Sequence, residues 1–234
     1  MERIETLEEV IQEGKERLHP PLTNPSWLVL RKRREIFQHW LVKLHAGEMD
    51  VLDLGGRIQP YRPLFAPNLR RYVAVDLRLS PLVEVVARAE ALPIADRQFD
   101  LVICTQVLQY VAQPALVISE VWRVLKQGGY FVFSVPSACA TDSENECWRF
   151  LPAGLRALLG SFREVEIIPE GGSVAGFFRT SNVCMNIFVR YPIVRAVFRR
   201  TVCPFINLLG AFLERLSGSR NEQFAVNYSG IARK

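Results

Sequence analysis

From Asp50 onward, short apolar runs of strand length alternate with helical patterns, and this alternation constrains the fold more than any other feature. The runs are rich in β-branched residues and lack a regular polar alternation, as expected for strands covered on both faces. Five of them occupy residues 50–54, 71–77, 83–87, 100–105 and 130–136. Two more, at 162–168 and 224–234, predict a final pair of antiparallel neighbours. The pattern predicts an α/β fold with a doubly wound, mostly parallel sheet of seven strands.

Two helical patterns precede the first strand. Residues 1–20 predict an exposed helix that ends at Pro20-Pro21, because proline cannot continue a helix. A second helix is expected from about Ser26 to Leu44, with its apolar residues at core spacing. The four basic residues 31–34 are spread round every face of this helix, so we interpret them as solvated surface.

Two more helices are expected between strands. Residues 114–126 carry one apolar stripe, and we expect Gly128-Gly129 to stop that helix. The segment LPAGLRALLG places Pro152 near a helix start and Gly160 just after its end.

The longest connection lies between the last two strands and spans roughly 55 residues, far more than a hairpin loop needs. Amphipathic patterns at 194–201 and 205–216 predict two helices there. We therefore divide the chain into an N-terminal helical extension (1–48), a core (49–170 and 222–234) and a basic helical insertion (171–221).

Positive charge is concentrated in this insertion. The net charge of the chain is +5, and between Gly176 and Arg220 seven arginines are opposed only by Glu214, so the remainder is close to neutral. One basic face argues against nucleic acid as a partner and for contact with something anionic. Three interpretations stay open: a lid over a substrate cleft, a surface lying on an anionic membrane, and a homodimer interface.

Cysteine usage and the N-terminus bear on the compartment. The five cysteines are scattered without C-x-x-C spacing, so neither a disulfide framework nor a metal site is predicted. The polar beginning MERIETLEEV shows no secretory signal, and no uncharged apolar run approaches the ~18 residues of a spanning helix. We expect a cytoplasmic protein, held peripherally at the inner face of the membrane if the insertion binds lipid.

Acidic residues end the first two strands, at the edge where a doubly wound sheet binds ligands. Asp53 ends the first strand and is followed by Gly55-Gly56, and Asp76 ends the second. A carboxylate at the end of the second strand can accept hydrogen bonds from both hydroxyls of a ribose. The arrangement predicts a nucleoside site at this edge.

A later series of motifs makes residues 50–170 similar to a known family. After VLDLGG and YVAVDL come E-A-L-P, F-D-L-V, V-L-Q-Y-V and V-L-K-x-G-G in that order, and then W-R-F-x-P-x-G-L-R. This succession resembles the Rossmann-like (class I) S-adenosylmethionine-dependent methyltransferases of the small-molecule or glycan type. The resemblance implies S-adenosylmethionine as cofactor and the following roles for residues of this chain.

The implied roles follow the strand ends. Asp53, Gly55 and Gly56 would shape the loop that passes the methionine part of the cofactor. Asp76 would hold the ribose hydroxyls while Leu77 packs on the adenine. The remaining implied contacts are Ala89 and Glu90 at the adenine, and Thr105 and Gln106 facing the sulfonium.

The chain departs from the family pattern in the loop after the first strand. Where the family usually continues Gly-x-Gly-x-Gly, because the backbone must approach the ligand closely, this chain has Arg57 and Gln59. Arg88 also stands where the family commonly has Asp. We interpret Arg57 as a bidentate partner for the methionine carboxylate that compensates for the missing glycines. Loss of cofactor binding and a different small ligand are the alternatives.

Candidates for the acceptor side lie in two loops. The loop after the fifth strand supplies Asp142, Glu144 and Glu146, any of which could act as general base or bind sugar hydroxyls. Tyr110 stands where relatives often carry histidine. The alternative for each is an ordinary loop or core position.

The sequence thus predicts a methyltransferase that moves the cofactor's methyl group to an oxygen, or less readily a nitrogen, of a small molecule or glycan. The rival hypothesis is a non-catalytic scaffold of the same fold that binds a partner or a membrane through the insertion. A nicotinamide-dependent oxidoreductase is disfavoured because G-x-G-x-x-G is absent.

Overall fold

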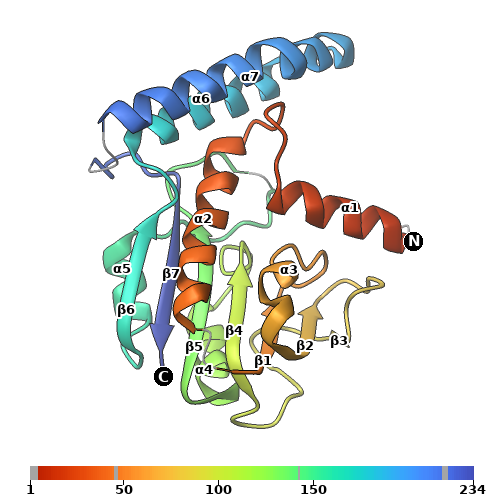
Figure 1. Ribbon diagram of the computed structural model, residues 1–234, viewed down its shortest axis with the longest axis vertical. Helices are drawn as coiled ribbons and strands as arrows, with labels where there is room; N and C mark the ends of the chain where they lie inside the picture. The colour runs from red at the N-terminus through yellow and green to blue at the C-terminus, as the bar shows by residue number, and fades with distance from the viewer. Residues whose placement is uncertain (1–4, 45–46, 142, 218–220) are drawn as a thin grey trace.

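A single seven-stranded sheet organises the part of the chain that the computed structural model describes, which comprises residues 5–44, 47–141, 143–217 and 221–234. The strands lie in the order β3-β2-β1-β4-β5-β7-β6 (Figure 1). Their bounds are β1 Met49–Leu54, β2 Leu69–Asp76, β3 Val85–Val86, β4 Phe99–Thr105, β5 Leu125–Pro136, β6 Arg163–Pro169 and β7 Asn227–Arg233. The pairs among β1–β5 are parallel, and β7 runs antiparallel to both β5 and β6. The predicted sheet and its final antiparallel pair are confirmed.

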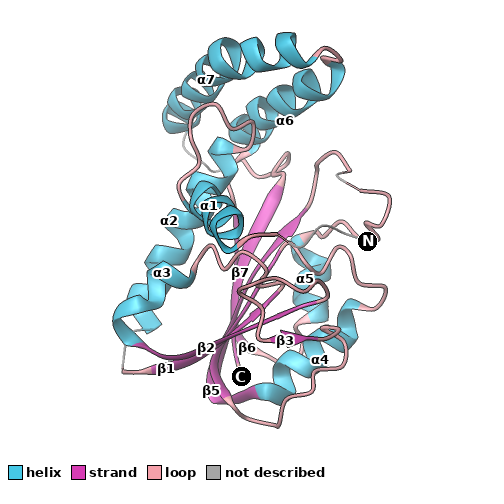
Figure 2. Cartoon of the chain, turned by 90° about the vertical axis from the view of Figure 1, so that its right-hand side faces the viewer, coloured by secondary structure: helices cyan, strands magenta, loops and turns pink. Residues whose placement is uncertain are grey.

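Helices cover both faces of the sheet, which explains why its strands are continuously apolar. Helices α4 (Pro114–Val124) and α5 (Pro152–Leu158) lie on one face, and α2 (Trp27–Leu44) and α3 (Arg62–Phe65) lie on the other (Figure 2). Two apolar clusters result, one containing Phe131 and Phe133 and the other containing Phe37 and Trp40. These clusters hold the strand ends in fixed relative positions.

The N-terminal helix α1 (Leu7–Leu18) ends before Pro20 as expected, but it is not fully exposed, because Val10, Gly14 and Leu18 are buried. Thr6 and Glu9 form a capping box at its start, with the Glu9 N–H donating to Thr6 Oγ1 at 3.3 Å. The helix ends at Leu18, before Pro20. A short 3-10 helix, Ala66–Asn68, follows α3.

The expected glycine stop after the fourth helix is wrong. Helix α4 already ends at Val124, and Gly128-Gly129 lie inside β5. Gly128 adopts a φ of +78°, and a Cβ on Gly129 would lie 3.1 Å from the carbonyl oxygen of Asp100. The two glycines therefore allow the irregular backbone at the start of β5, where its pairing register with β4 shifts.

The insertion forms a helical hairpin, but its helices differ from those expected. Helix α6 (Ser173–Phe188) was not predicted, and both predicted patterns belong to one continuous helix, α7 (Pro192–Ser217), with Pro204 inside it. Helix α6 escaped detection because its buried side contains Arg179 and Asn182 rather than an apolar stripe. The hairpin lies above the carboxyl ends of the parallel strands (Figure 1).

Candidate active site

The turn after β1 is tied to the neighbouring strand. Gly55 has a φ of +78°, and the N–H groups of Gly55 and Gly56 donate to the carbonyl oxygen of Val75 at 2.8 and 3.2 Å. Asp53 lies beneath this turn, 3% exposed, and accepts a 2.6 Å hydrogen bond from the hydroxyl of Tyr72. Burial raises the pKa of Asp53 to about 7, although the hydrogen bond from Tyr72 acts to lower it. The charges of neighbouring carboxylates add to the rise. Asp53 therefore supports the turn from below.

The end of β2 offers a carboxylate beside an exposed apolar side chain. Oδ1 of Asp76 accepts a 2.9 Å hydrogen bond from the N–H of Arg78, and Leu77 is 66% exposed. Farther along, Arg88 donates to Glu90 at 2.8 Å, so the basic substitution is paired with the adjacent acidic residue. A carboxylate next to an uncovered apolar surface suits the sugar and base of a nucleoside.

Arg57 binds helix α1. Its two terminal nitrogens contact the carboxylates of Glu5 and Glu13 at 2.6–2.7 Å. The hypothesis that Arg57 binds the methionine carboxylate would require the guanidinium to leave these two partners. In this structure Arg57 fastens α1 over the loop after β1.

Gln59 occupies the position of the last family glycine with a left-handed backbone, at a φ of +41°. Its side chain is buried; the amide nitrogen donates to the carbonyl oxygen of Leu82, and its amide oxygen accepts from Arg62 at 2.9 Å. Ser80 Oγ also donates to the carbonyl oxygen of Arg57, at 3.2 Å. Side-chain bonds thus join the loop after β1 to the loop after β2, where the family pattern has only glycine backbone.

A cavity of about 290 Å³ opens at the ends of β4 and β7, beneath α6 and beside α1 and α2. Gln106, the residue after β4, lines it with a φ of +57°. The N–H of Gln106 donates to the carbonyl oxygen of Ser134 at 2.8 Å, and its amide nitrogen donates to the hydroxyl of Ser134 at 3.0 Å. Thr105 is the last residue of β4, immediately before it.

A buried ion pair forms part of the cavity wall. Arg33 of α2 is 2% exposed and makes two 2.8 Å bonds to Glu170, which follows β6. Glu170 also accepts from the hydroxyls of Ser134 and Ser229, at 2.5 and 2.6 Å. The interpretation of residues 31–34 as solvated surface is therefore wrong for Arg33.

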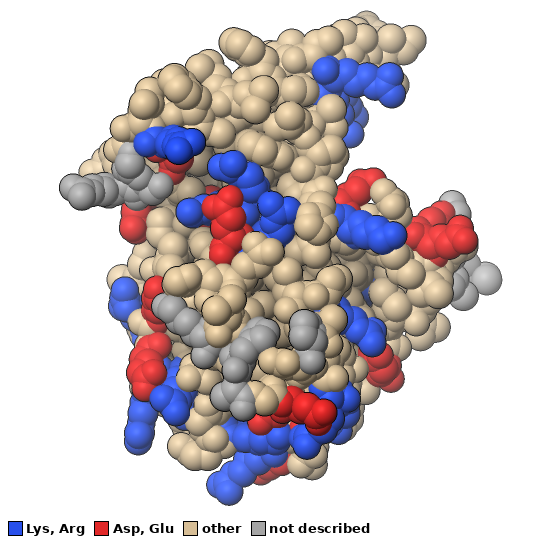
Figure 3. All heavy atoms as spheres, in the orientation of Figure 1, with Lys and Arg blue, Asp and Glu red and all other residues tan. Residues whose placement is uncertain are grey.

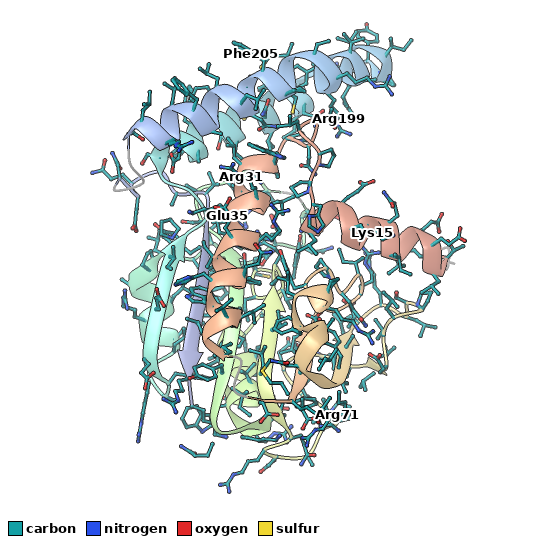
Figure 4. The ribbon with its side chains drawn as sticks, viewed as in Figure 1. Lys15, Arg31, Glu35, Arg71, Arg199 and Phe205 are labelled. Atoms are coloured by element: carbon teal, nitrogen blue, oxygen red, sulfur yellow. The ribbon has the colours of Figure 1, made fainter. Side chains whose placement is uncertain are left out.

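The other members of that basic run, Arg31, Lys32 and Arg34, are half-buried. Arg31 reaches Glu35 at 3.7 Å on the exposed side of α2 (Figure 4). The helical period of the sequence could have indicated that Arg33 is buried. Arg33 falls on the same face of α2 as Leu30, Phe37 and Trp40, which are all buried. A charge at a core position requires a buried partner.

The described acceptor-side candidates, Tyr110, Glu144 and Glu146, lie in two loops that the structure joins, and none of them lines this cavity. The N–H groups of Cys147 and Trp148 donate to the carbonyl oxygen of Gln109 at 2.6 and 3.2 Å, which brings the loop of Glu146 to that of Tyr110. Tyr110 is partly exposed and Glu144 is exposed. Glu146 pairs with Arg149 at 2.7 Å.

Asp142 lies outside the described residues. Within the described ranges, no group of three or more His, Cys, Asp or Glu side chains could hold a metal ion. The proposed catalytic roles of Tyr110, Glu144 and Glu146 stay predictions.

Comparison with known proteins agrees with this geometry. Residues 52–133 match a family model described as a methyltransferase domain. This segment contains the turn after β1, Asp76 and Gln106. Residues 52–133 thus form part of a methyltransferase domain.

Among curated relatives, the malonyl-[acyl-carrier protein] O-methyltransferase of Marinomonas sp. (strain MWYL1) is 39% identical to this chain over 132 residues, which are 50% of this chain and 49% of that protein. The chain spans about half the length of the curated relatives it matches.

Solved structures show the same fold at low identity. An S-adenosylmethionine-dependent methyltransferase from Archaeoglobus fulgidus superposes with a TM-score of 0.57 at 15% identity, covering 95% of this chain and 99% of that one. The [4+2]-cyclase SpnF superposes with a TM-score of 0.54 at 16% identity, covering 99% and 97%.

The methyltransferase site fits its cofactor best at the nucleoside end. One oxygen of Asp76 is held by its own loop, and the exposed Leu77 offers the apolar contact that an adenine ring needs. At the methionine end, the Gly55-Gly56 turn is kept, but Arg57 and Gln59 replace two glycines with bonded side chains. The residues present therefore fit S-adenosylmethionine, with a loop rebuilt by side-chain hydrogen bonds.

Proposed function

We propose that this chain transfers a methyl group from S-adenosylmethionine to an oxygen of a small molecule or glycan. The observation that carries the proposal is the polar cavity beside Gln106, the residue that the family resemblance implies at the sulfonium. An acceptor in this cavity would lie next to the end of β4. The O-methyltransferase activity named for the Marinomonas relative favours oxygen over nitrogen.

The cofactor, when bound, supplies an electrophilic methyl group on a positively charged sulfur. The protein's task is then to align the acceptor oxygen with the methyl group and to take up a proton if that oxygen is a hydroxyl. Asp76 and Leu77 would bind the nucleoside, and Gln106, held by Ser134, would form the wall between nucleoside and acceptor. The candidates for the proton acceptor, Tyr110, Asp142, Glu144 and Glu146, stay predictions, because the described ones do not line this cavity.

Calorimetric titration with S-adenosylhomocysteine, followed by a screen for methylated products against hydroxyl-, carboxyl- and amine-bearing compounds, tests the proposal. Binding with methylation of an oxygen supports it. Methylation of nitrogen alone contradicts the oxygen assignment, and absence of binding favours the scaffold hypothesis. The cyclase among the solved neighbours shows that this fold also serves other chemistry.

We also propose that the α6–α7 hairpin attaches the protein peripherally to an anionic membrane. Helix α7 is built with its apolar side outward: Cys203, Asn207 and Gly210 are buried, whereas Phe205 and Phe212 are largely exposed. The space-filling view shows a broad surface free of charge over the hairpin (Figure 3), and Phe205 lies on the side of α7 turned away from the sheet (Figure 4).

Charge and length complete the membrane proposal. Besides the buried Arg179, five arginines (Arg190, Arg195, Arg199, Arg200 and Arg215) lie on the hairpin, and its acidic residue Glu214 accepts from the N–H groups of Gly172 and Ala175. Arginines that flank an exposed apolar surface are typical of helices that lie on anionic bilayers. By length and composition alone α7 could also cross a bilayer, but its polar buried side and its packing against α6 favour surface attachment.

Vesicle flotation tests this attachment. We expect the protein to float with phosphatidylcholine vesicles that contain phosphatidylglycerol and less with phosphatidylcholine alone. The double variant Phe205→Ser/Phe212→Ser should lose flotation, whereas Val42→Ser, which alters an exposed apolar residue on α2, should keep it. If the double variant floats like the parent, or a stable dimer covers these residues instead, the membrane proposal is wrong.

A further inference from the structure

The cavity beneath α6 contains an arginine whose charge the described residues leave uncompensated. Arg179 is 9% exposed, and its Nε and one terminal nitrogen are buried without a hydrogen-bond partner among the described residues. A guanidinium stays protonated in proteins, and a buried charge without a partner is costly. Arg179 lines the cavity, so its two unpaired donors lie where a ligand with hydrogen-bond acceptors would enter.

A second arginine adds to this positive field. Arg17 of α1 lines the same cavity, and burial together with the charge of Arg33 lowers its pKa. Two other charges of the wall are paired, Arg33 with Glu170 and Glu13 with Arg57. The exposed Glu16 accepts a 2.9 Å hydrogen bond from the neutral amide of Gln12. Arg17 and Arg179 are thus the two groups available to a ligand.

We infer that Arg179, assisted by Arg17, binds an anionic group of the methyl acceptor, a carboxylate or a phosphate. This inference rests on the proposed function, because it names the chemical class of the acceptor at that site. The planar guanidinium matches both anions through paired hydrogen bonds. The acceptor is therefore an acid or a phosphate ester rather than a neutral sugar.

The carboxylate of the cofactor is the other conceivable source of this anion. The turn residues Gly55, Gly56 and Arg57, which are all described, do not line the cavity. Arg179 belongs to the insertion, outside residues 52–133 that match the methyltransferase family. Both observations assign the anion to the acceptor.

Inorganic phosphate is the first probe. We expect phosphate, titrated at constant ionic strength, to raise the melting temperature of the full chain in a saturable way. Arg179→Met should weaken phosphate binding about tenfold or more, since charge-assisted hydrogen bonds are lost. Arg163→Met, an exposed residue of β6 that does not line the cavity, should bind phosphate like the parent. Acetate in place of phosphate distinguishes a phosphate-selective site from a general anion site.

The stability of Arg179→Met without anion gives an internal check. Because Arg179→Met removes a buried unpaired charge, the variant without anion should be at least as stable as the parent. Arg17→Met provides a second variant, with a smaller expected loss of phosphate affinity because this residue is only partly buried. Absence of saturable phosphate binding, or equal binding by parent and Arg179→Met, overturns the inference.

Cofactor analogues separate the two sources of the anion. If the acceptor supplies it, S-adenosylhomocysteine binds the parent and Arg179→Met with the same affinity, and phosphate binds alongside it. If Arg179→Met weakens S-adenosylhomocysteine but not methylthioadenosine, which lacks the carboxylate, the anion belongs to the cofactor and our assignment is wrong. Failure of the parent to bind S-adenosylhomocysteine contradicts the proposed function and is read separately from the phosphate titration.

Discussion

Arg33 and Glu170 form a two-bond ion pair across the interior, although 137 positions separate them in the sequence. The pair joins α2, which precedes the sheet, to the segment that follows β6 and leads into α6. Through the hydroxyls of Ser134 and Ser229, Glu170 also contacts β5 and β7. One carboxylate therefore fixes four elements around the cavity.

Breaking this pair should be strongly destabilising. Removal of one partner leaves the other charge buried, so Glu170→Gln or Arg33→Met should each lower the free energy of unfolding by about 3–5 kcal/mol. The double variant should lose much less than the sum of the single losses. Urea unfolding of the three variants measures this coupling, and additive losses would show that the two side chains act independently.

The sequence predicted the sheet better than the polar interior. Apolar strand runs report burial on both faces, so all seven strands were found within a few residues. Arg33 and Arg179 were missed because their partners or roles depend on contacts far away in the chain. Helix α6 was missed because its buried side contains polar residues and shows no apolar stripe.

Asp53 should make stability depend on pH. Burial raises its pKa to about 7, above the ordinary value near 4, so the folded state binds more protons between these values. Its contribution to stability is full below about pH 4 and is lost as the pH rises through 7. Asp53→Asn, which keeps an oxygen for the Tyr72 hydroxyl, should thus gain stability relative to the parent at pH 8 but not at pH 4. Melting curves of the cofactor-free proteins measure this, and a difference that does not change with pH would contradict it.

Arg57 should hold α1 rather than the cofactor. Its contacts with Glu5 and Glu13 are partly exposed, so Arg57→Met should cost no more than about 1 kcal/mol of global stability. It should nevertheless release α1, making that helix more sensitive to limited proteolysis. The affinity for S-adenosylhomocysteine should fall less than about tenfold, below the loss expected for a direct charge-assisted contact. If Arg57→Met loses more affinity than this for S-adenosylhomocysteine while its sensitivity to proteolysis is unchanged, Arg57 binds the methionine carboxylate as the sequence predicted.

The candidate site was only partly accessible from the sequence. Asp76 and Gln106 lie at strand ends, which topology places at one edge of the sheet, and both stand at that edge in the structure. The partners of Arg57 and the left-handed Gln59 could not be foreseen, because the family pattern offers only glycines there. The cavity proposed for the acceptor is lined by residues of α1, α2 and α6, whose packing on the core no local motif encodes.

Calorimetric titration of the parent and of Asp76→Ala with S-adenosylhomocysteine tests the central claim most directly. A methyltransferase site at the end of β2 predicts saturable one-site binding by the parent and no detectable binding by an Asp76→Ala variant that melts at the parent's temperature. No heat from the parent at ligand concentrations on the order of 1 mM, or equal affinity in both proteins, would contradict it.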